Sequence, residues 1–129
     1  MTTLRIANFE EIRTIEVEMI NGIGIHLVGE RDAFVKETLL RVVTALQSAG
    51  VSIPAKKIII NISAQSIYGE PKRVIGHEES HDLPIAIGIL KEMGRLAYNV
   101  NELGFVAGGR LKLDGTIYGT DFNIKQIVK

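Results

Sequence analysis

The sequence predicts a two-layer α+β domain in which helices pack on a mixed sheet. Residues 13–20 alternate between apolar and polar side chains, which is the period of a half-buried strand. Residues 32–48 and 83–96 carry apolar side chains at helical spacing, and residues 57–62 form a nearly continuous β-branched run. Together with shorter elements these segments follow the order β-β-α-β-α-β-β, which is typical of this class.

The first predicted strand leads into a hairpin signal. Between residues 15 and 19 the odd positions are apolar and the even positions are glutamate. Asn21-Gly22 is a strong two-residue turn signal, so residues 23–28 are expected to form the partner strand. Residues 29–32 then turn the chain toward the first helix.

The first helix is expected from Asp32 to Ser48, because Gly50 follows its last apolar position and glycine commonly ends helices. Pro54 marks the following loop. Residues 57–62 (Lys-Ile-Ile-Ile-Asn-Ile) are expected to form a central strand that is covered on both faces.

Residues 63–81 read as a long polar loop, and loops of this length in compact domains are usually functional or mobile. The second helix is expected over residues 83–96. Asp82 is predicted as its N-cap, because a carboxylate there accepts hydrogen bonds from free backbone N–H groups. Pro84 fits the first turn, where its missing N–H has no helical partner.

The last third of the chain predicts small elements. Residues 103–106 are expected to form a short strand. Residues 111–113 and 116–118 flank Asp114-Gly115, a second hairpin signal. Residues 121–129 are expected to begin a last helix.

Composition limits the classes of function. The 129 residues favour a single domain spanning 1–129. Basic and acidic residues number 15 each, so net charge gives no general argument for nucleic-acid or membrane binding. The absence of cysteine excludes disulfides, thiolate metal sites and cysteine catalysis. No signal peptide or membrane-spanning run is evident, so we expect a cytoplasmic protein with no membrane partner.

Residues 77–81 (His-Glu-Glu-Ser-His) match the H-E-x-x-H pattern of zinc proteases. That chemistry needs both histidines on one face of a regular helix. Pro84 places the helix start after the motif, and no third ligand is evident. We therefore expect no catalytic metal, and His77 and His81 remain only candidates for adventitious metal binding, with Asp82 beside them.

A serine and lysine peptidase is a second enzymatic hypothesis. Ser80 lies next to a helix N-terminus, where the dipole stabilises an oxyanion, and Lys125 or Lys112 would be the base. The simpler interpretation is that Ser80 and Asp82 cap the helix, and we favour it because any serine near a helix start looks the same.

No P-loop sequence occurs, and Gly108-Gly109-Arg110 lacks the required Lys-Ser/Thr ending. ATP hydrolysis by this chain alone is therefore not expected, and neither is a cofactor within it.

Six basic residues are candidate contacts to DNA phosphates. Glutamates flank one pair of them, and no aromatic residue interleaves them in sequence, so base stacking receives no support. The candidates are Lys56, Lys57, Lys72, Arg73, Arg110 and Lys112.

Several segments together resemble the N-terminal domain of the ComM/YifB proteins, the Mg-chelatase-like or ChlI-type competence family. The sequence Asp-Leu-Pro-Ile-Ala-Ile-Gly-Ile-Leu (82–90) resembles the family signature D-L-P-I-A-L-G-I-L almost residue for residue, with Asp82, Leu83 and Pro84 at its start. The other similar segments, in family order, are Asn21-Gly22 with 25–29, Asp32 with 35–37 and 41–42, Pro54 with 57–63, and Leu113-Asp114-Gly115.

The resemblance implies a ribosomal protein S5 domain 2-like fold, which the Lon protease domain shares. In full-length relatives this domain precedes an AAA+ ATPase that acts as a hexameric DNA helicase in natural transformation and recombination. The expected partners are therefore an AAA+ ATPase domain or subunit, through which oligomers would form, and DNA. ATP and Mg²⁺ are implied only for that ATPase domain, which this chain lacks.

The resemblance also argues against proteolysis. Alignment of the apolar helix with that of Lon places Asp82, not a serine, at the nucleophile position. Ile124 falls at the lysine position, with Lys125 one residue away, a rotation of roughly 100° on a helix. The sequence departs from the family at Glu30-Arg31, where the family has Leu-Pro, at His81, where it has an aromatic residue, and at Arg110, near a usual Glu.

Three hypotheses follow. The first is a non-catalytic Lon-like domain that serves a DNA-processing ATPase as an assembly or DNA-contacting module. The second is a degenerate peptidase or metal-binding enzyme that uses residues 77–82. The third is a pure protein-interaction module.

Overall fold

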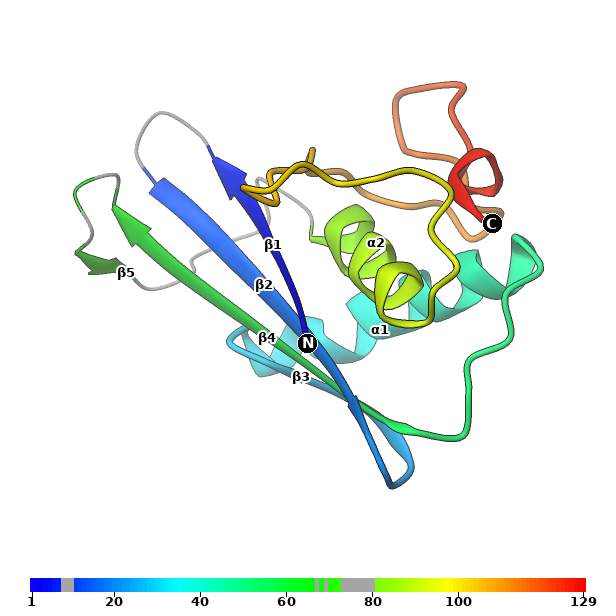
Figure 1. Ribbon diagram of the computed structural model, residues 1–129, viewed down its shortest axis with the longest axis horizontal. Helices are drawn as coiled ribbons and strands as arrows, with labels where there is room; N and C mark the ends of the chain where they lie inside the picture. Colours follow the sequence, from blue (N-terminus) through cyan, green and yellow to red (C-terminus); the bar gives the residue numbers. More distant parts are fainter. Residues whose placement is uncertain (8–10, 67, 69, 73–80) are drawn as a thin grey trace.

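The structure is a computed structural model of the 129-residue chain, and it describes residues 1–7, 11–66, 68, 70–72 and 81–129 (Figure 1). Its strands are β1 (Thr2–Ala7), β2 (Glu11–Ile20), β3 (Gly24–Val28), β4 (Lys57–Ser66) and β5 (Pro71–Lys72), and its helices are α1 (Asp32–Ser48), α2 (Asp82–Glu92) and the 3-10 helix η1 (Ile124–Ile127).

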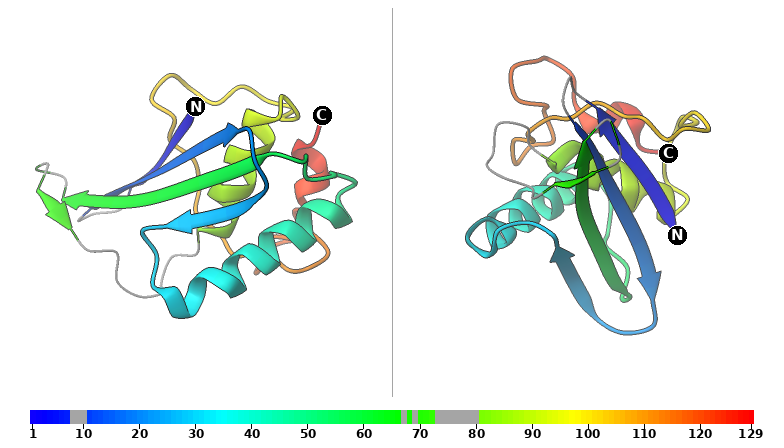
Figure 2. Two further views of the ribbon diagram at one scale, coloured as in Figure 1. Left: turned by 90° about the horizontal axis from the view of Figure 1, so that it is seen from below. Right: turned by 90° about the vertical axis from the view of Figure 1, so that its left-hand side faces the viewer.

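The strands form one mixed sheet in the order β1-β2-β4-β3, and β5 pairs with β4. Strand β2 is antiparallel to β1 and to β4, whereas β3 and β4 are parallel and are connected through α1. Both long helices lie on the same face of the sheet (Figure 2). The predicted α+β class with helices on a mixed sheet is therefore confirmed.

The expected hairpin between β2 and β3 is wrong. Asn21 and Gly22 reverse the chain, but β4 lies between the two strands and pairs with β2 over its whole length, from Glu11 opposite Ser66 to Ile20 opposite Lys57. Strand β4 offers β2 ten paired positions, and β3 has only five residues. The long, isoleucine-rich strand therefore occupies the centre, and β3 pairs with its other side.

Strand β4 is central, as predicted, but it is not covered on both faces. Its burial alternates along the strand: Ile58, Ile60 and Ile62 are buried under the helices, and the residues between them are partly or fully exposed. The strand also continues to Ser66, into the segment expected to be a loop, and β5 lies within that segment as well.

Strand β1 was not predicted from the sequence. Its buried positions are Thr2, Leu4 and Ile6, and only two of these are large apolar residues. The strand expected over residues 103–106 is reduced to a bridge between Phe105 and Arg5. The backbone N–H of Arg5 donates to Gly104 and its carbonyl accepts from Val106, at 2.8 and 2.9 Å. This segment therefore covers the outer edge of β1.

Helix α1 has the predicted bounds, but α2 ends at Glu92, four residues early. Gly94 adopts a φ of +71°, and the N–H of Arg95 donates to the carbonyl of Leu90 at 2.8 Å. This is the pattern of a helix closed by a left-handed glycine. The helix ends there because the following backbone hydrogen bonds turn the chain back.

Helix α2 is the centre of the core. Every residue from Asp82 to Leu90 is buried, because the helix lies between β1, β2 and α1. A helix that is apolar on all sides is typical of this position. Gly88 permits the close approach to the sheet, since a Cβ atom built there would lie 2.6 Å from Cγ2 of Val17.

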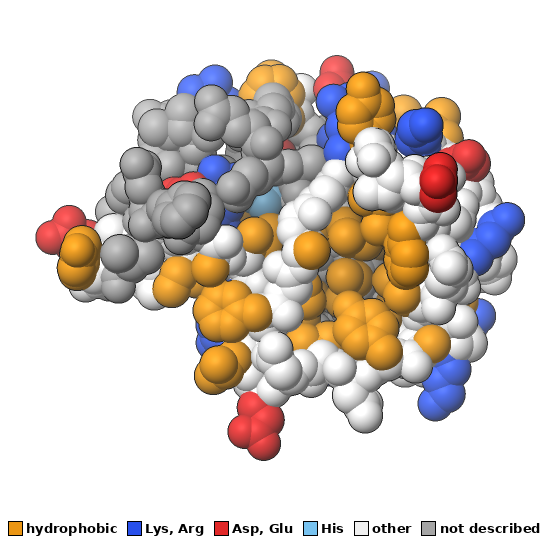
Figure 3. Space-filling model, turned by 90° about the horizontal axis from the view of Figure 1, so that it is seen from above, with side chains coloured by type: hydrophobic (Ala, Val, Ile, Leu, Met, Phe, Trp, Pro, Cys, Tyr) orange, Lys and Arg blue, Asp and Glu red, His pale blue; other side chains and the backbone are white. Residues whose placement is uncertain are grey.

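The segment after α2 returns across the helices as loops. Leu111 and Ile117 form an antiparallel bridge around Asp114-Gly115, which confirms the second hairpin signal. The expected last helix is only one 3-10 turn, η1, which Asn123 caps by accepting a hydrogen bond from the N–H of Lys125 at 2.9 Å. On the face that these loops share, hydrophobic side chains surround a hollow (Figure 3).

We predict that Gly88→Ala destabilises the domain by about 1 to 2 kcal/mol, because overpacking against Val17 outweighs the gain in helix propensity. Chemical denaturation measures the loss. Val17→Ala supplies the control, since it removes the methyl group in the way. If Gly88→Ala costs as much in the Val17→Ala background as alone, the close approach is not the cause.

Candidate functional site

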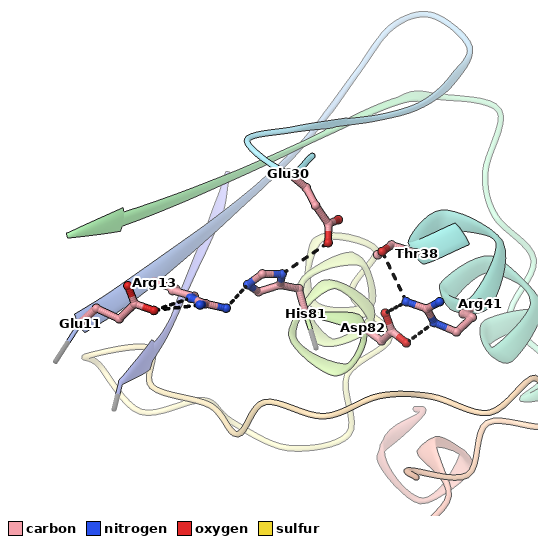
Figure 4. Close-up of polar contacts among 7 residues, drawn as sticks. All are labelled: Glu11, Arg13, Glu30, Thr38, Arg41, His81 and Asp82. Carbon is pink, nitrogen blue, oxygen red and sulfur yellow. Dashed lines mark hydrogen bonds and ion pairs between the residues drawn. The ribbon is translucent and has the colours of Figure 1, made fainter. Parts of the chain in front are cut away.

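The first residue of α2, Asp82, is a fully buried carboxylate that joins three parts of the fold (Figure 4). Its Oδ2 accepts hydrogen bonds from Nε of Arg41 on α1 at 2.7 Å and from the backbone N–H of Leu111 at 3.0 Å. Its Oδ1 accepts from Nη2 of Arg41 at 3.1 Å. We call this arrangement, formed by Asp82, Arg41 and the N–H of Leu111, the Asp82 clamp.

The predicted N-cap role of Asp82 is wrong. His81 occupies the N-cap position and makes no side-chain cap, so Asp82 is the first helical residue. The backbone groups there find other partners: the N–H of Leu83 donates to the carbonyl of Gly109, Pro84 has no N–H, and the N–H of Ile85 donates to the carbonyl of His81, each bond being 3.0 Å. The carboxylate is thus left to bind Arg41 and Leu111.

Charge and geometry both stabilise the clamp. The two-pronged contact between a guanidinium and a carboxylate is among the stronger hydrogen-bonded pairs in proteins. The hydrogen bond to Asp82 raises the pKa of Arg41, whose side chain also contacts Thr38 at 3.4 Å. The negative charge lies in the first turn of α2, where the helix dipole favours it. The pair therefore satisfies a charge that would otherwise be costly to bury.

The described residues include the lysines of the serine and lysine hypothesis but not its serine. The start of α2 carries the committed carboxylate of Asp82, Ile124 is fully buried, and Lys125 is exposed on η1. The ammonium group of Lys112 lies 6.0 Å from the ring centroid of Tyr118. Ser80, the nucleophile of the peptidase hypothesis, lies outside the described residues.

His81 belongs to a second buried polar group that runs from β2 to the turn after β3 (Figure 4). Its Nε2 lies 3.1 Å from Nη1 of Arg13, and its Nδ1 lies 3.9 Å from Oε1 of Glu30. Arg13 also pairs with Glu11 at 2.8 Å. A guanidinium can only donate, so Nε2 of His81 accepts and the ring proton belongs on Nδ1, toward Glu30.

Nε2 of His81, one of the two ring nitrogens through which a histidine can bind a metal ion, is already in contact with Arg13. Within the described ranges no three His, Asp or Glu side chains are grouped to hold a metal ion. His77, the other candidate, lies outside them. Glu30 and His81, two departures from the family pattern, thus contact each other, and Oε2 of Glu30 is buried without a hydrogen-bond partner among the described residues.

The described basic candidates lie at separate places along the fold. Lys56 and Lys57 lie at the start of β4, where Lys56 donates to Asn21 at 3.2 Å. Lys72 pairs with Ala64 near the other end of β4. At about 3.3 Å per residue, Lys57 and Ala64 are separated by roughly 23 Å along the strand. Arg73 lies outside the described residues.

Arg110 and Lys112 occupy a third place, beside a groove of about 830 Å³ between α1 and the 110–118 hairpin. The groove is lined by Glu37, Leu40, Arg41, Arg110, Leu111, Lys112, Leu113 and Tyr118. Arg41 and Leu111 are also the partners of Asp82, so the groove lies directly over the Asp82 clamp.

Most of this site is not predicted by the sequence. Leu40, Leu113 and Tyr118 carry no motif, and they come together only because the hairpin folds against α1. No aromatic residue interleaves the cations in sequence, yet the hairpin places Tyr118 beside Arg110 and Lys112. The N–H of Tyr118 donates to the carbonyl of Arg110 at 2.8 Å, and the ammonium group of Lys112 lies 6.0 Å from the ring centroid. Arg41 lies in residues 41–42, one of the segments that resemble the family. That resemblance was the one sequence signal that pointed to a residue of this site.

Comparison with known proteins identifies the family of this chain. The sequence model of the family described as subunit ChlI of Mg-chelatase matches residues 15–129. The chain belongs to this family. The match includes β3, α1, β4, α2 and the 110–118 hairpin, and therefore every part of the Asp82 clamp.

Three curated proteins match the chain as well. It is 40% identical over 108 residues to competence protein ComM of Haemophilus influenzae and 37% identical over 108 residues to the uncharacterized protein YifB of Salmonella typhimurium. YifB of Escherichia coli is 36% identical over 108 residues. Each match covers 82% of this chain but only 19 or 20% of the relative, so the chain spans about a fifth of their length.

Within the described residues no helix has the length and apolar character needed to cross a bilayer.

We predict that Asp82→Ala lowers the free energy of unfolding by about 3 kcal/mol, because Arg41 and the Leu111 N–H lose their shared acceptor. Urea denaturation measures it, with Glu102→Gln, an exposed acid in the segment after α2, as a control expected within about 0.5 kcal/mol. Arg41→Met added to Asp82→Ala should cost less than the two single losses summed. Full additivity would contradict the clamp.

Proposed function

We propose that this chain is a non-catalytic, Lon-protease-like domain that serves an AAA+ ATPase of the ComM/YifB type as an assembly module. Residues 1–129 form one domain in this proposal, with a ribosomal protein S5 domain 2-like fold. ATP and Mg²⁺ belong to the ATPase part, and the site of action is the cytoplasm, in recombination and natural transformation.

The observation that carries the non-catalytic role is the Asp82 clamp. A catalytic nucleophile or base at the start of α2 would need access to substrate, whereas Asp82 is fully buried and bonded to Arg41 and Leu111. A carboxylate with these partners holds structure together. This supports a role in which the position has become structural.

Two further observations support a role within a larger protein. The curated relatives are about five times longer than the part that this chain matches, and one of them is named a competence protein. The groove over the clamp exposes apolar side chains at a place fixed by the fold. A domain without chemistry of its own, attached to a longer chain, is suited to contacting other parts of that protein.

Direct DNA contact is the alternative within this role. The described cations lie at separate places on the fold, and Lys56 already donates to Asn21. Phosphate binding gains from several cations along one track, and each contact adds to the salt dependence. Their separation therefore favours assembly over a dedicated DNA surface.

We predict no peptidase activity above background on casein or on fluorogenic peptides. The resemblance places Asp82 and Ile124 at the positions of the Lon-type serine and lysine. Ser80→Ala should therefore leave the signal unchanged, and a fluorophosphonate probe should not label the chain. Labelling that disappears in Ser80→Ala would establish the peptidase hypothesis in place of this one.

The assembly role is tested on ComM of Haemophilus influenzae. Removal of the region that this chain matches should shift the protein to smaller oligomers in mass photometry and lower its ATPase rate, because subunits lose a contact surface. The parallel arm titrates this chain against labelled duplex and branched DNA at low and moderate salt. Unchanged assembly after the deletion, with salt-sensitive DNA binding by the chain, would replace assembly by DNA contact.

A further inference from the structure

Large apolar side chains are exposed in the groove between α1 and the 110–118 hairpin. Leu40 is 63% exposed, Leu113 is 56% exposed and Tyr118 is 68% exposed, and all three line the same groove. Single exposed leucines are ordinary, but clustered ones beside an aromatic ring in a concave surface are typical of interaction sites. Covering these side chains would release a hydrophobic free energy that the isolated chain does not gain.

The charge around these apolar side chains is mostly positive. Arg110 and Lys112 stand on the hairpin side, and neither forms an ion pair with a described carboxylate. The third cation of the groove, Arg41, is already neutralised by Asp82. Glu37 is the only acidic residue among the described residues that line the groove, and Asp114 at the hairpin tip lies near enough to Lys112 for their charges to interact. Arg110 and Lys112 are therefore available to an acidic ligand.

The groove is also held in shape before anything binds. The hydroxyl of Ser48, the last residue of α1, donates to the carbonyl of Leu113 at 2.8 Å. Across the hairpin, the N–H of Lys112 donates to Thr116 at 2.9 Å, and at the groove floor Leu111 is tied to Asp82. A preformed surface loses little conformational entropy on binding, which favours affinity.

We propose that this groove docks an acidic protein segment with an aliphatic or aromatic anchor. The anchor packs among Leu40, Leu113 and Tyr118, and the carboxylates of the segment face Arg110 and Lys112. The inference rests on the proposed assembly role and names its surface and the chemistry of its partner.

A nucleic acid fits the same groove less well. Arg110, Lys112 and Tyr118 are the residue types that hold single strands, but Leu40 and Leu113 add two aliphatic side chains that offer a phosphate backbone nothing. A protein segment that carries an apolar anchor and carboxylates complements both the apolar side chains of the groove and the positive charge beside them.

The first experiment is an array of overlapping peptides covering the part of Haemophilus influenzae ComM that this chain does not match, probed with the purified chain. We expect the strongest peptides to combine carboxylates with Leu, Ile, Phe or Tyr. The strongest one is then titrated in solution by fluorescence anisotropy, beside a version with lysine in place of each acid and a version with serine in place of each anchor. Both altered peptides should bind at least about tenfold more weakly.

Variants of the chain identify the surface. Leu40→Ser with Leu113→Ser, and separately Arg110→Glu with Lys112→Glu, should each weaken the peptide about tenfold. The matched controls are Ile23→Ser, an apolar residue that is 84% exposed elsewhere, and Lys56→Glu, an exposed cation at the start of β4. Both should leave binding unchanged. Thermal melts establish that each variant is folded, which is expected because the replaced side chains are exposed.

Several outcomes would overturn the inference. One is an array in which no peptide binds above background, and another is peptide binding that survives both groove variants. A third is displacement of the peptide by oligo-dT together with loss of oligo-dT binding in Tyr118→Ala. That result would make the groove a nucleic-acid site. The ComM deletion reports separately on the proposed function. If the deletion disturbs assembly while the groove variants leave peptide binding unchanged, the assembly role stands and this surface is wrong.

Discussion

A buried carboxylate must have partners, and the arrangement of this domain follows from the partners that Asp82 has. Its charge is removed from water at the start of the most buried helix, where an unpaired ion would cost several kcal/mol. Arg41 reaches it from α1, and the backbone of Leu111 reaches it from the segment after α2. One side chain therefore fixes how two helices and a hairpin meet, and the groove formed by α1 and the hairpin depends on the same contact.

The Asp82 clamp and the groove above it bear directly on the function proposed for this chain. At the position where the resemblance places a serine in the protease relatives, the chain carries a residue that binds its own fold. The surface above it exposes Leu40, Leu113 and Tyr118 instead of a nucleophile. A shaped, partly apolar groove is suited to holding another segment, which is the role proposed within a ComM-type protein.

Local patterns predicted the elements far better than their partners. Helix α1 has the expected bounds because its apolar spacing and Gly50 are local signals. The pairing of β2 with β3 was wrong because a turn signal carries no information about the strand that β4 later inserts between them. Strand β1 was missed because Leu4 and Ile6 alone do not establish a period.

The site was less predictable than the fold, since its contacts span long sequence distances. Asp82 looked like a helix cap because the residue type and Pro84 fit a cap, and no pattern shows that Arg41 lies opposite it. The basic residues were all candidate phosphate contacts by residue type, but the described ones occupy separate places on the sheet and the hairpin. The family resemblance, which depends on ordered segments, was the sequence feature that led correctly to the ChlI family.

The most direct test of this account is hydrogen exchange, followed by NMR, at the backbone amide of Leu111. If the Asp82 clamp organises the domain, that amide should be protected nearly as well as the amide of Ile85 inside α2, although it lies in a loop segment. Protection should fall selectively at Leu111 in Arg41→Met. Exchange as fast as that of the exposed residues 101–103 would show that the clamp does not hold the hairpin, and the account would be wrong.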